Sequence, residues 1–223
     1  MGKLIVMEGT DGSGKSTQFR RLTQRLTEQG LRFEHIVFPQ YSQPSSALIR
    51  MYLSGEFGSA PGDVNAYAAS AFYAVDRYAS YKKGWGDFYR SGGLVLSDRY
   101  TTSNAVHQTV KLPPEAQPEF LKWLDDFEYN RLGLPRPDLT LYLDVPTDFT
   151  CRLMRRREEE THTQADIHEQ DLAYLSACRQ AGRAAAAFYG WTVISCVRDG
   201  VLRTVEDIHE EIYRHVANCL EEI

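Results

Sequence analysis

The stretch Gly9-Thr10-Asp11-Gly12-Ser13-Gly14-Lys15-Ser16 decides the fold of this chain, because it matches the pattern G-x-x-x-x-G-K-[ST] at every fixed position. It stands after the apolar run Leu4 to Met7 and before a helical pattern over residues 15–29. Glycines let the backbone curl so that its N–H groups point at phosphate oxygens, and the helix adds the positive end of its dipole. Lys15 can reach the β- and γ-phosphates of a nucleotide, and the Ser16 hydroxyl can bind Mg²⁺. The stretch therefore predicts a phosphate-binding loop between a strand and a helix.

Short apolar runs alternate with long helical patterns along the whole chain. The runs that we expect to be strands are Leu4 to Met7, Glu34 to Phe38, Leu94 to Leu96, Leu139 to Leu143 and Trp191 to Ile194. Helical periodicity is clearest over residues 15–29 and 63–80, whereas Gly- and Pro-rich composition predicts loops from Gly55 to Gly62 and from Leu112 to Pro118. The alternation predicts an α/β fold, a five-stranded parallel sheet flanked by helices.

Length and composition limit what such a protein can do. The 223 residues, of which 43% are hydrophobic and 25% charged, are expected to form one soluble domain over residues 1–223. The net charge of −5 argues against non-specific binding to nucleic acid. The first apolar run is too short for a signal peptide, and no stretch has the length of a membrane span. Four scattered cysteines are expected to be reduced thiols in the cytoplasm; they are Cys151, Cys178, Cys196 and Cys219.

Acidic and basic side chains follow three of the predicted strands. Asp11 lies within the glycine loop, where it accepts a hydrogen bond from a sugar hydroxyl, helps to hold a metal's water shell, or simply forms a turn. Asp98 and Arg99 follow the third strand, so they face the ligand crevice of a parallel sheet unless they form a surface ion pair. Asp98 can hold Mg²⁺, and Arg99 suits a phosphate. Asp144 ends the next strand and competes with Asp98 for the metal.

Helix 63–80 carries two distinct faces. Its apolar stripe contains Val64, Tyr67, Ala68, Ala71, Phe72, Val75 and Tyr78. Tyr73 and Arg77 lie nearly opposite that stripe, one turn apart. A nucleobase could stack on Tyr73 while Arg77 donates to a base carbonyl, although two side chains on a solvated face would show the same spacing.

An arginine-rich segment follows the fourth strand. Arg152, Arg155, Arg156 and Arg157 precede three glutamates, so residues of about 152–168 form either a charged, solvated helix or a lid over a transferring phosphoryl group. A lid would place positive charge on that group and exclude water.

Taken together, these motifs resemble the thymidylate kinase (dTMP kinase) family of P-loop nucleoside monophosphate kinases over nearly the whole chain. The resemblance is carried by the Gly9 to Ser16 loop with its internal aspartate, by F-P-x-Y from Phe38, by D-R at Asp76 and by D-R-Y at Asp98. It implies a P-loop kinase fold with a short lid, Mg²⁺ as cofactor, ATP and dTMP as ligands, and a homodimer built from helices. The implied reaction is direct transfer of the ATP γ-phosphoryl group to dTMP.

The resemblance also implies roles for individual residues. The implied ATP-binding residues are Gly9, Thr10, Asp11, Gly12, Ser13, Gly14, Lys15, Ser16, Thr17 and Arg152. The implied dTMP-binding residues are Asp11, Phe38, Tyr41, Tyr73, Arg77, Arg99, Asn104 and Gln108. Lys15, Asp11, Arg99 and Arg156 are the expected catalytic residues. The expected metal ligands are Ser16 and Asp98, and we prefer Asp98 to Asp144 because an arginine adjoins it.

The chain departs from the family pattern at four positions, namely Gly12, Tyr41, Tyr73 and His107. Some members carry arginine at the first two, so the lid is expected to supply the missing positive charge here. The other two departures leave the preference for thymine open. A deoxynucleoside kinase, another nucleoside monophosphate kinase or a catalytically silent nucleotide-binding module therefore remain as alternatives. A GTPase would be expected to carry an N-K-x-D-like guanine motif, and the sequence contains none.

Overall fold

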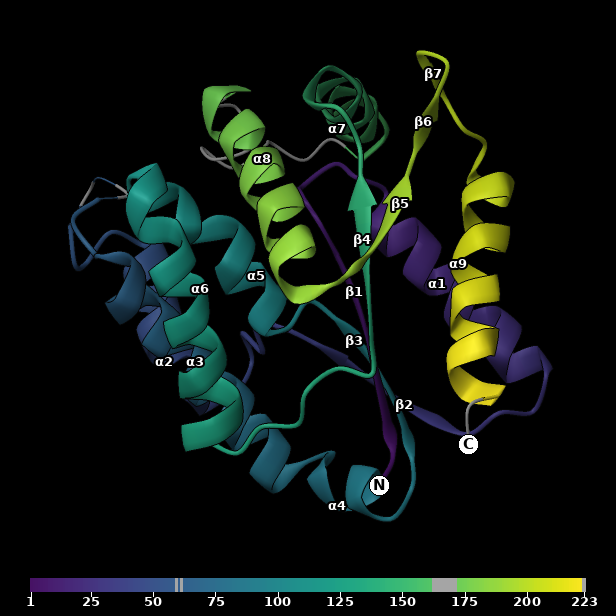
Figure 1. Ribbon diagram of the computed structural model, residues 1–223, viewed down its shortest axis with the longest axis horizontal. Coiled ribbons are helices and arrows are strands. Elements are labelled where there is room, and N and C mark those ends of the chain that lie inside the picture. The colour runs from purple at the N-terminus through teal and green to yellow at the C-terminus, as the bar shows by residue number, and fades with distance from the viewer. Residues whose placement is uncertain (59, 61, 162–171, 222–223) are drawn as a thin grey trace. The chain divides into compact units, whose positions relative to one another are not determined.

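The computed structural model (Figure 1) describes residues 1–58, 60, 62–161 and 172–221, with the backbone alone from 155 to 161. Five strands form the main sheet, in the order β2-β3-β1-β4-β5. Their bounds are β1 (Lys3–Gly9), β2 (Phe33–Val37), β3 (Leu94–Asp98), β4 (Leu139–Asp144) and β5 (Thr192–Ser195). The five predicted strands and the α/β class are thereby confirmed, with ends that differ by one or two residues.

Parallel pairing holds neighbouring strands in register. β2 and β3 run in parallel with Phe33 opposite Leu94 and Val37 opposite Asp98. β4 and β5 run in parallel with Asp144 opposite Ser195. Asp98 and Asp144 therefore both stand at the carboxyl ends of their strands, where parallel sheets bind ligands.

The chain divides into two compact units, each of which is described by itself. Unit 1 comprises Met1–Val6 and Phe33–Asp138, and unit 2 comprises Met7–Arg32 and Leu139–Ile223. Among the described residues, no helix combines the length and apolar character needed to cross a membrane.

Unit 1 is mainly helical around β2 and β3. Its α-helices are α2 (Ala47–Leu53), α3 (Ala66–Lys83), α4 (Gly86–Arg90), α5 (Thr101–His107) and α6 (Gln117–Asp125), and a π-helical turn, Asp126–Arg131, continues α6. Three short 3₁₀ turns complete the unit: Pro44–Ser46, Thr109–Lys111 and Pro114–Ala116. The expected loop from Leu112 to Pro118 is therefore partly wrong, because Pro114 and Pro118 lie in first turns, where proline is tolerated.

A compact aromatic core supports unit 1. Trp85 stands at its centre, with its ring in edge contact with Tyr81 at 4.8 Å and with Tyr100 at 6.3 Å between centroids. The buried members of the core are Leu4, Val6, Ile36, Phe38, Tyr81, Trp85, Tyr89, Val95, Tyr100 and Leu134.

Helix α3 does not bury its apolar stripe most deeply. The expected apolar stripe remains partly open, with Tyr67 37%, Val75 49% and Tyr78 38% exposed. The face that carries Arg77 is buried instead, because alanines and serines along it allow close packing. The residues buried on α3 are Ala66, Ala69, Ser70, Ala74, Asp76, Arg77, Ser80 and Tyr81. Apolar periodicity located the helix, but the apolar stripe is not the face that packs in the core.

Unit 2 places helices on both sides of β4 and β5. Its elements are α1 (Lys15–Glu28), α7 (Thr147–Thr161), α8 (Leu172–Tyr189), α9 (Val205–Glu221) and an antiparallel hairpin of β6 (Val197–Arg198) and β7 (Val201–Leu202). In Figure 1, α8 lies on one side of β4 and β5 and α9 on the other. α1 packs against α9, where Arg25 donates to Glu210 at 2.6 Å and stacks 3.4 Å over the ring of Tyr213.

Candidate functional site

The glycine loop of unit 2 exposes the first N–H groups of α1. Strand β1 ends at Gly9 and α1 begins at Lys15. Gly14 holds the N-cap position in the left-handed conformation, with φ 81°, and contributes no side-chain cap. The N–H groups at this helix end therefore remain available to an anion, as the sequence pattern requires.

Two positions in the loop leave no room for a side chain. A Cβ on Gly9 would lie 2.6 Å from the Ser13 hydroxyl oxygen. A Cβ on Gly12, where φ is +75°, would lie 2.6 Å from Met154 Cγ and 2.8 Å from the Thr150 carbonyl. Since α7 carries both of those residues, the first turns of α7 pack directly on the loop. An arginine at position 12, as some family members carry, has no space in this chain.

The side chains of the loop differ in exposure. Lys15 is only 7% exposed although it is charged, while Ser16 is exposed to solvent. Asp11 and Thr17 are half-buried, and Thr10 and Ser13 are buried. The loop thus offers one sheltered cation and one accessible hydroxyl beside the helix N-terminus.

Asp144 at the end of β4 is held by an arginine that the sequence analysis did not single out. Arg179 of α8 donates from Nε to Oδ1 at 2.7 Å and from Nη2 to Oδ2 at 3.2 Å. Arg183, one turn further on, comes within 3.8 Å of the same carboxylate. The hydrogen bond to Asp144, which outweighs partial burial, raises the pKa of Arg179. The spacing of these two arginines on α8 was the signal in the sequence that could have pointed to an anion-binding helix face. The sequence does not show that Arg179 pairs with Asp144, which is 35 residues away.

The lid residues are described in part. Arg152 is exposed near the start of α7, where it stacks 4.1 Å over Phe149 and donates from Nη2 to Asp148 Oδ2 at 3.1 Å. The side chains of Arg155, Arg156 and Arg157, and residues 162–168 of the expected lid, lie outside the described residues.

In unit 1, Arg77 forms a buried ion pair with Glu128. Its Nε donates to Oε2 at 2.6 Å and its Nη2 to Oε1 at 2.5 Å, while the two residues are 1% and 0% exposed. Burial, the largest single effect, lowers the pKa of Arg77, but the charge and the hydrogen bonds of Glu128, together with smaller contributions from nearby tyrosines, outweigh it and raise that pKa. Of the two alternatives for this helix face, a solvated position is therefore wrong for Arg77.

Two side chains of α5 also form hydrogen bonds with the Glu128 carboxylate. Thr101 Oγ1 donates to Oε2 at 2.8 Å, and Asn104 Nδ2 lies 3.3 Å from Oε1. Glu128 sits in the π-helical turn, a feature that frequently marks functional sites. No motif in the sequence pointed to it, because its partners come from distant segments.

Tyr73 shares its surroundings with several of the predicted binding residues. Burial, then the nearby Tyr41 and Tyr52, raises the pKa of the Tyr73 phenol, and the charges of Arg77 and Arg99 act in the opposite direction. The structure therefore brings together Tyr41, Tyr73, Arg77 and Arg99, which we call the arginine–tyrosine cluster.

Arg99 adopts a strained backbone conformation. Its φ of 67° is uncommon for a residue with a side chain, and Ser97 Oγ donates to its carbonyl at 2.5 Å. From this turn the guanidinium Nη1 lies 3.3 Å from Ser103 Oγ and 3.2 Å from His107 Nε2. Backbone strain of this kind is typical of positions that bind or act on a ligand.

Asp76 ties the F-P-x-Y segment to α3. Its carboxylate accepts from the Gln40 N–H at 2.8 Å and from Ser45 Oγ at 2.6 Å. The ring of Phe38 is 3% exposed in the core, 6.0 Å from the ring of Tyr100, whereas Tyr41 is 52% exposed. Phe38 thus supports the segment, and Tyr41 is the side chain that the segment exposes.

The remaining predicted residues of unit 1 lie at the end of β3 and on α5. Asp98 is half-buried, and its charge partly offsets the burial that lowers the pKa of His35. Gln108 is 5% exposed, and its Oε1 has no hydrogen-bond partner among the described residues. A buried amide oxygen of this kind is suited to accept from a ligand.

Comparisons with known proteins agree with the fold and identify the family. The thymidylate kinase family model matches residues 7–212. The chain is 33% identical to a thymidylate kinase of Mycobacterium tuberculosis over 190 residues, 84% of this chain and 87% of that protein. It is 28% identical to a thymidylate kinase of Caenorhabditis elegans over 224 residues, 96% of this chain and 91% of that protein.

A solved structure shows the same fold. The thymidylate kinase of Candida albicans aligns with a TM-score of 0.71 and 21% identity, over 97% of this chain and 92% of that one. The match of the family model over most of the chain identifies its family directly. The chain belongs to the thymidylate kinase family.

Proposed function

We propose that the chain transfers the γ-phosphoryl group of ATP directly to dTMP in the cytoplasm, by in-line displacement and with Mg²⁺. Phosphorylation of dTMP to dTDP is the reaction of the family to which it belongs. The observation that carries the proposal is the pairing of two anion-binding arrangements in one chain. Unit 2 holds the glycine loop, and unit 1 holds the arginine–tyrosine cluster.

The glycine loop is suited to the donor nucleotide. The uncapped N–H groups of α1 and the sheltered ammonium of Lys15 would bind the ATP phosphates, with the bound residues running from Gly9 to Thr17. Charge on the transferring group spreads over its oxygens, so these donors stabilise the transition state more than the ground state. Asp11, half-buried in the loop, is proposed to accept from the 3′-hydroxyl of dTMP.

The chemistry of the available ligands fits Mg²⁺. The Ser16 hydroxyl and the Asp98 carboxylate would hold the ion, which prefers oxygen ligands. Asp144 is the weaker candidate, because Arg179 already engages both of its oxygens. Within the described part of the chain, no three His, Cys, Asp or Glu side chains form a metal cluster, so phosphates and water would complete the shell. When bound, Mg²⁺ neutralises charge on the phosphates.

The arginine–tyrosine cluster is suited to the acceptor nucleotide. Thymine would stack on Tyr73, and Arg99 with Tyr41 would hold the dTMP phosphate. Three of the five N–H groups of Arg77 bond to Glu128 and Tyr100, which leaves the others for a base carbonyl. Asn104 and the buried oxygen of Gln108 would lie along the base and sugar.

We propose that the lid supplies the remaining positive charge near the transferring phosphoryl group. Since Gly12 has no room for a side chain, we assign the missing charge to Arg156 and place Arg152 near the adenine. The chain would act as one domain, with a lid of about residues 152–168.

A homodimer is supported by α3. The stripe of Tyr67, Val75 and Tyr78 is open on α3, and Leu48 and Leu53 of the adjoining α2 are 38% and 43% exposed. Contiguous apolar side chains on two neighbouring helices are typical of an interface between subunits. We propose that a second copy of the chain covers this stripe.

The test is an assay of ADP release with ATP, Mg²⁺ and a panel of acceptors: dTMP, dUMP, dGMP, AMP and thymidine. The proposal expects dTMP to have the highest kcat/KM. Faster turnover of thymidine would indicate a deoxynucleoside kinase, and a different preferred monophosphate another member of the same class. ATP binding without turnover of any acceptor would indicate a silent nucleotide-binding module.

A further inference from the structure

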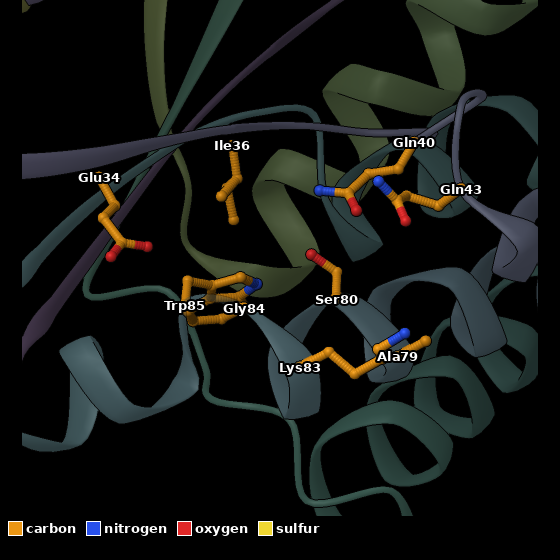
Figure 2. Close-up of a pocket in the computed structure, with 9 residues that line it drawn as sticks. All are labelled: Glu34, Ile36, Gln40, Gln43, Ala79, Ser80, Lys83, Gly84 and Trp85. Carbon is orange, nitrogen blue, oxygen red and sulfur yellow. The ribbon is translucent and has the colours of Figure 1, made fainter.

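A pocket of about 310 Å³ opens in unit 1, apart from the arginine–tyrosine cluster. Figure 2 shows its walls: the edge strand β2, the segment that follows it, and the last two turns of α3 with the residues just after them. The lining residues are Glu34, Ile36, Gln40, Gln43, Ala79, Ser80, Lys83, Gly84 and Trp85. None of them has a role in the proposed reaction.

Trp85 brings a buried donor to this pocket. Its side chain is 1% exposed, yet its Nε1 has no hydrogen-bond partner among the described residues. In Figure 2 the nitrogen-bearing edge of the indole is turned toward Ser80, which lines the pocket. A buried N–H without an acceptor costs free energy in the native state, so a ligand that supplies an acceptor would recover it.

The other lining groups restrict the ligand's charge. Glu34 and Lys83 contribute opposite charges that cancel, and α3 ends at Lys83, so its carbonyl end disfavours an anion. Ile36 and Ala79 contribute apolar groups to the lining, while the amides of Gln40 and Gln43 can both donate and accept. The lining thus matches a flat molecule with polar edges and no net charge.

We propose that this pocket binds an uncharged heteroaromatic molecule of about nucleobase size, with a ring carbonyl or ring nitrogen that accepts from Trp85 Nε1. The volume lies at the lower end of the range for small-molecule sites, about 300–1,000 Å³, which suits one such ring system. Because Gln40 and Gln43 flank Tyr41, the ligand is also placed to alter acceptor binding. That consequence rests on the proposed function, but the binding itself does not.

The experiment follows the indole N–H signals of the ¹⁵N-labelled full chain by NMR; the chain has three tryptophans. The signal of Trp85 is assigned with Trp85→Phe, which keeps an aromatic ring but removes the donor. Uracil and 2-pyridone serve as uncharged probes, and orotate, which is uracil with a carboxylate, serves as the anionic control. The expected result is a saturable shift of the Trp85 signal with both uncharged probes and a much smaller one with orotate.

Two variants test the assigned contacts through the side-chain amide signals of Gln40 or Gln43. Trp85→Phe is expected to weaken uracil binding about fivefold, the effect of one neutral hydrogen bond. Trp123→Phe, at a ring that stacks on Phe127 at 5.0 Å, is the matched control and leaves the affinity unchanged. If Trp85→Phe does not fold, Gln40→Ala replaces it, with about threefold weaker binding expected through loss of one polar contact.

Three results would overturn the proposal: no shift of the Trp85 signal at the solubility limit of either uncharged probe, a shift with orotate equal to that with uracil, or unchanged affinity in the pocket variants. None of them depends on kinase activity, so failure here is distinguishable from failure of the proposed function.

Discussion

Arg77 and Glu128, which are 51 residues apart in the chain, form a two-bond ion pair in the interior of unit 1. The pair joins α3 to the π-helical turn after α6, and Thr101 and Asn104 of α5 bond to the same carboxylate. One carboxylate in the π-helical turn therefore positions α3 and α5, two helices that carry predicted ligand-binding residues. Desolvation of both charges is tolerated because every partner in this network is itself a hydrogen-bonding group.

Glu128→Gln should destabilise the chain strongly. The substitution leaves the Arg77 guanidinium charged and buried without its counterion, a change that typically costs about 3–5 kcal/mol in free energy of unfolding. Urea unfolding measures the loss, with Glu115→Gln at an exposed position as the control, expected within about 0.5 kcal/mol of wild type. Equal stability of the two variants would show that the buried pair does not hold these segments together.

Gly12→Ala should impair ATP binding more than stability. The new Cβ would meet Met154 and Thr150, and φ of +75° disfavours any side chain, so the loop must shift away from the phosphates. Displacement of such positioning groups costs about 100-fold in kcat/KM. Gly30→Ala is the matched control, because its φ is +74° and a Cβ there meets nothing within 4 Å. It should lose about 1 kcal/mol of stability while kcat/KM stays unchanged; a similar loss of activity in both variants would contradict this account.

Arg99→Ala should weaken binding of the acceptor nucleotide and leave binding of the donor nucleotide unchanged. Loss of a charge-assisted contact to the dTMP phosphate is expected to cost roughly 2 kcal/mol or more, about a 30-fold rise in the Kd of dTMP. Calorimetric titration with dTMP and, separately, with an ATP analogue measures both affinities. Arg90→Ala, which removes a surface ion pair with Asp87, should change neither. An unchanged dTMP affinity in Arg99→Ala would favour an unphosphorylated acceptor.

Val75→Glu should convert the proposed dimer into monomers. A carboxylate in the middle of the open stripe on α3 would be buried without a partner when two copies associate. Sedimentation velocity measures the mass, and Gln24→Glu on the exposed surface of α1 adds the same charge as a control. A wild-type chain that sediments as a monomer at every concentration would refute the dimer.

Lys111 should make stability depend on pH between about 8 and 10.5. Burial lowers the pKa of its ammonium from 10.5 to about 8, and the group donates to the Tyr52 hydroxyl at 2.8 Å and to the Val64 carbonyl at 3.0 Å. In that pH window the unfolded chain holds more protons than the native state, so the contribution of Lys111 to the free energy of unfolding rises with pH. Urea unfolding at pH 7 to 10 should show that the free energy of unfolding of wild type rises with pH relative to that of Lys111→Met. A constant difference across the series would mean that the lysine titrates normally.

Sequence reasoning succeeded where the determining interactions are local. The glycine loop could be predicted because conformations with positive φ, the strand before the loop and the helix after it are all encoded within residues 4 to 29. The strands could be predicted for the same reason, since a buried parallel strand is a short continuous apolar run. By contrast, the packed face of α3 could not be predicted from periodicity, because small residues there pack more closely than the larger apolar ones.

The amino-acid sequence by itself determined the phosphate loop, the parallel α/β sheet and the types of residue that we propose bind two nucleotides. Only the tertiary structure decided that Glu128 fixes Arg77, that Arg179 holds Asp144 and that the indole N–H of Trp85, which has no acceptor among the described residues, is turned toward a pocket. The physical reason is the separation along the chain of the residues that interact. A backbone turn depends on neighbouring residues, whereas an ion pair or a cavity depends on side chains that the folded chain brings together from distant segments.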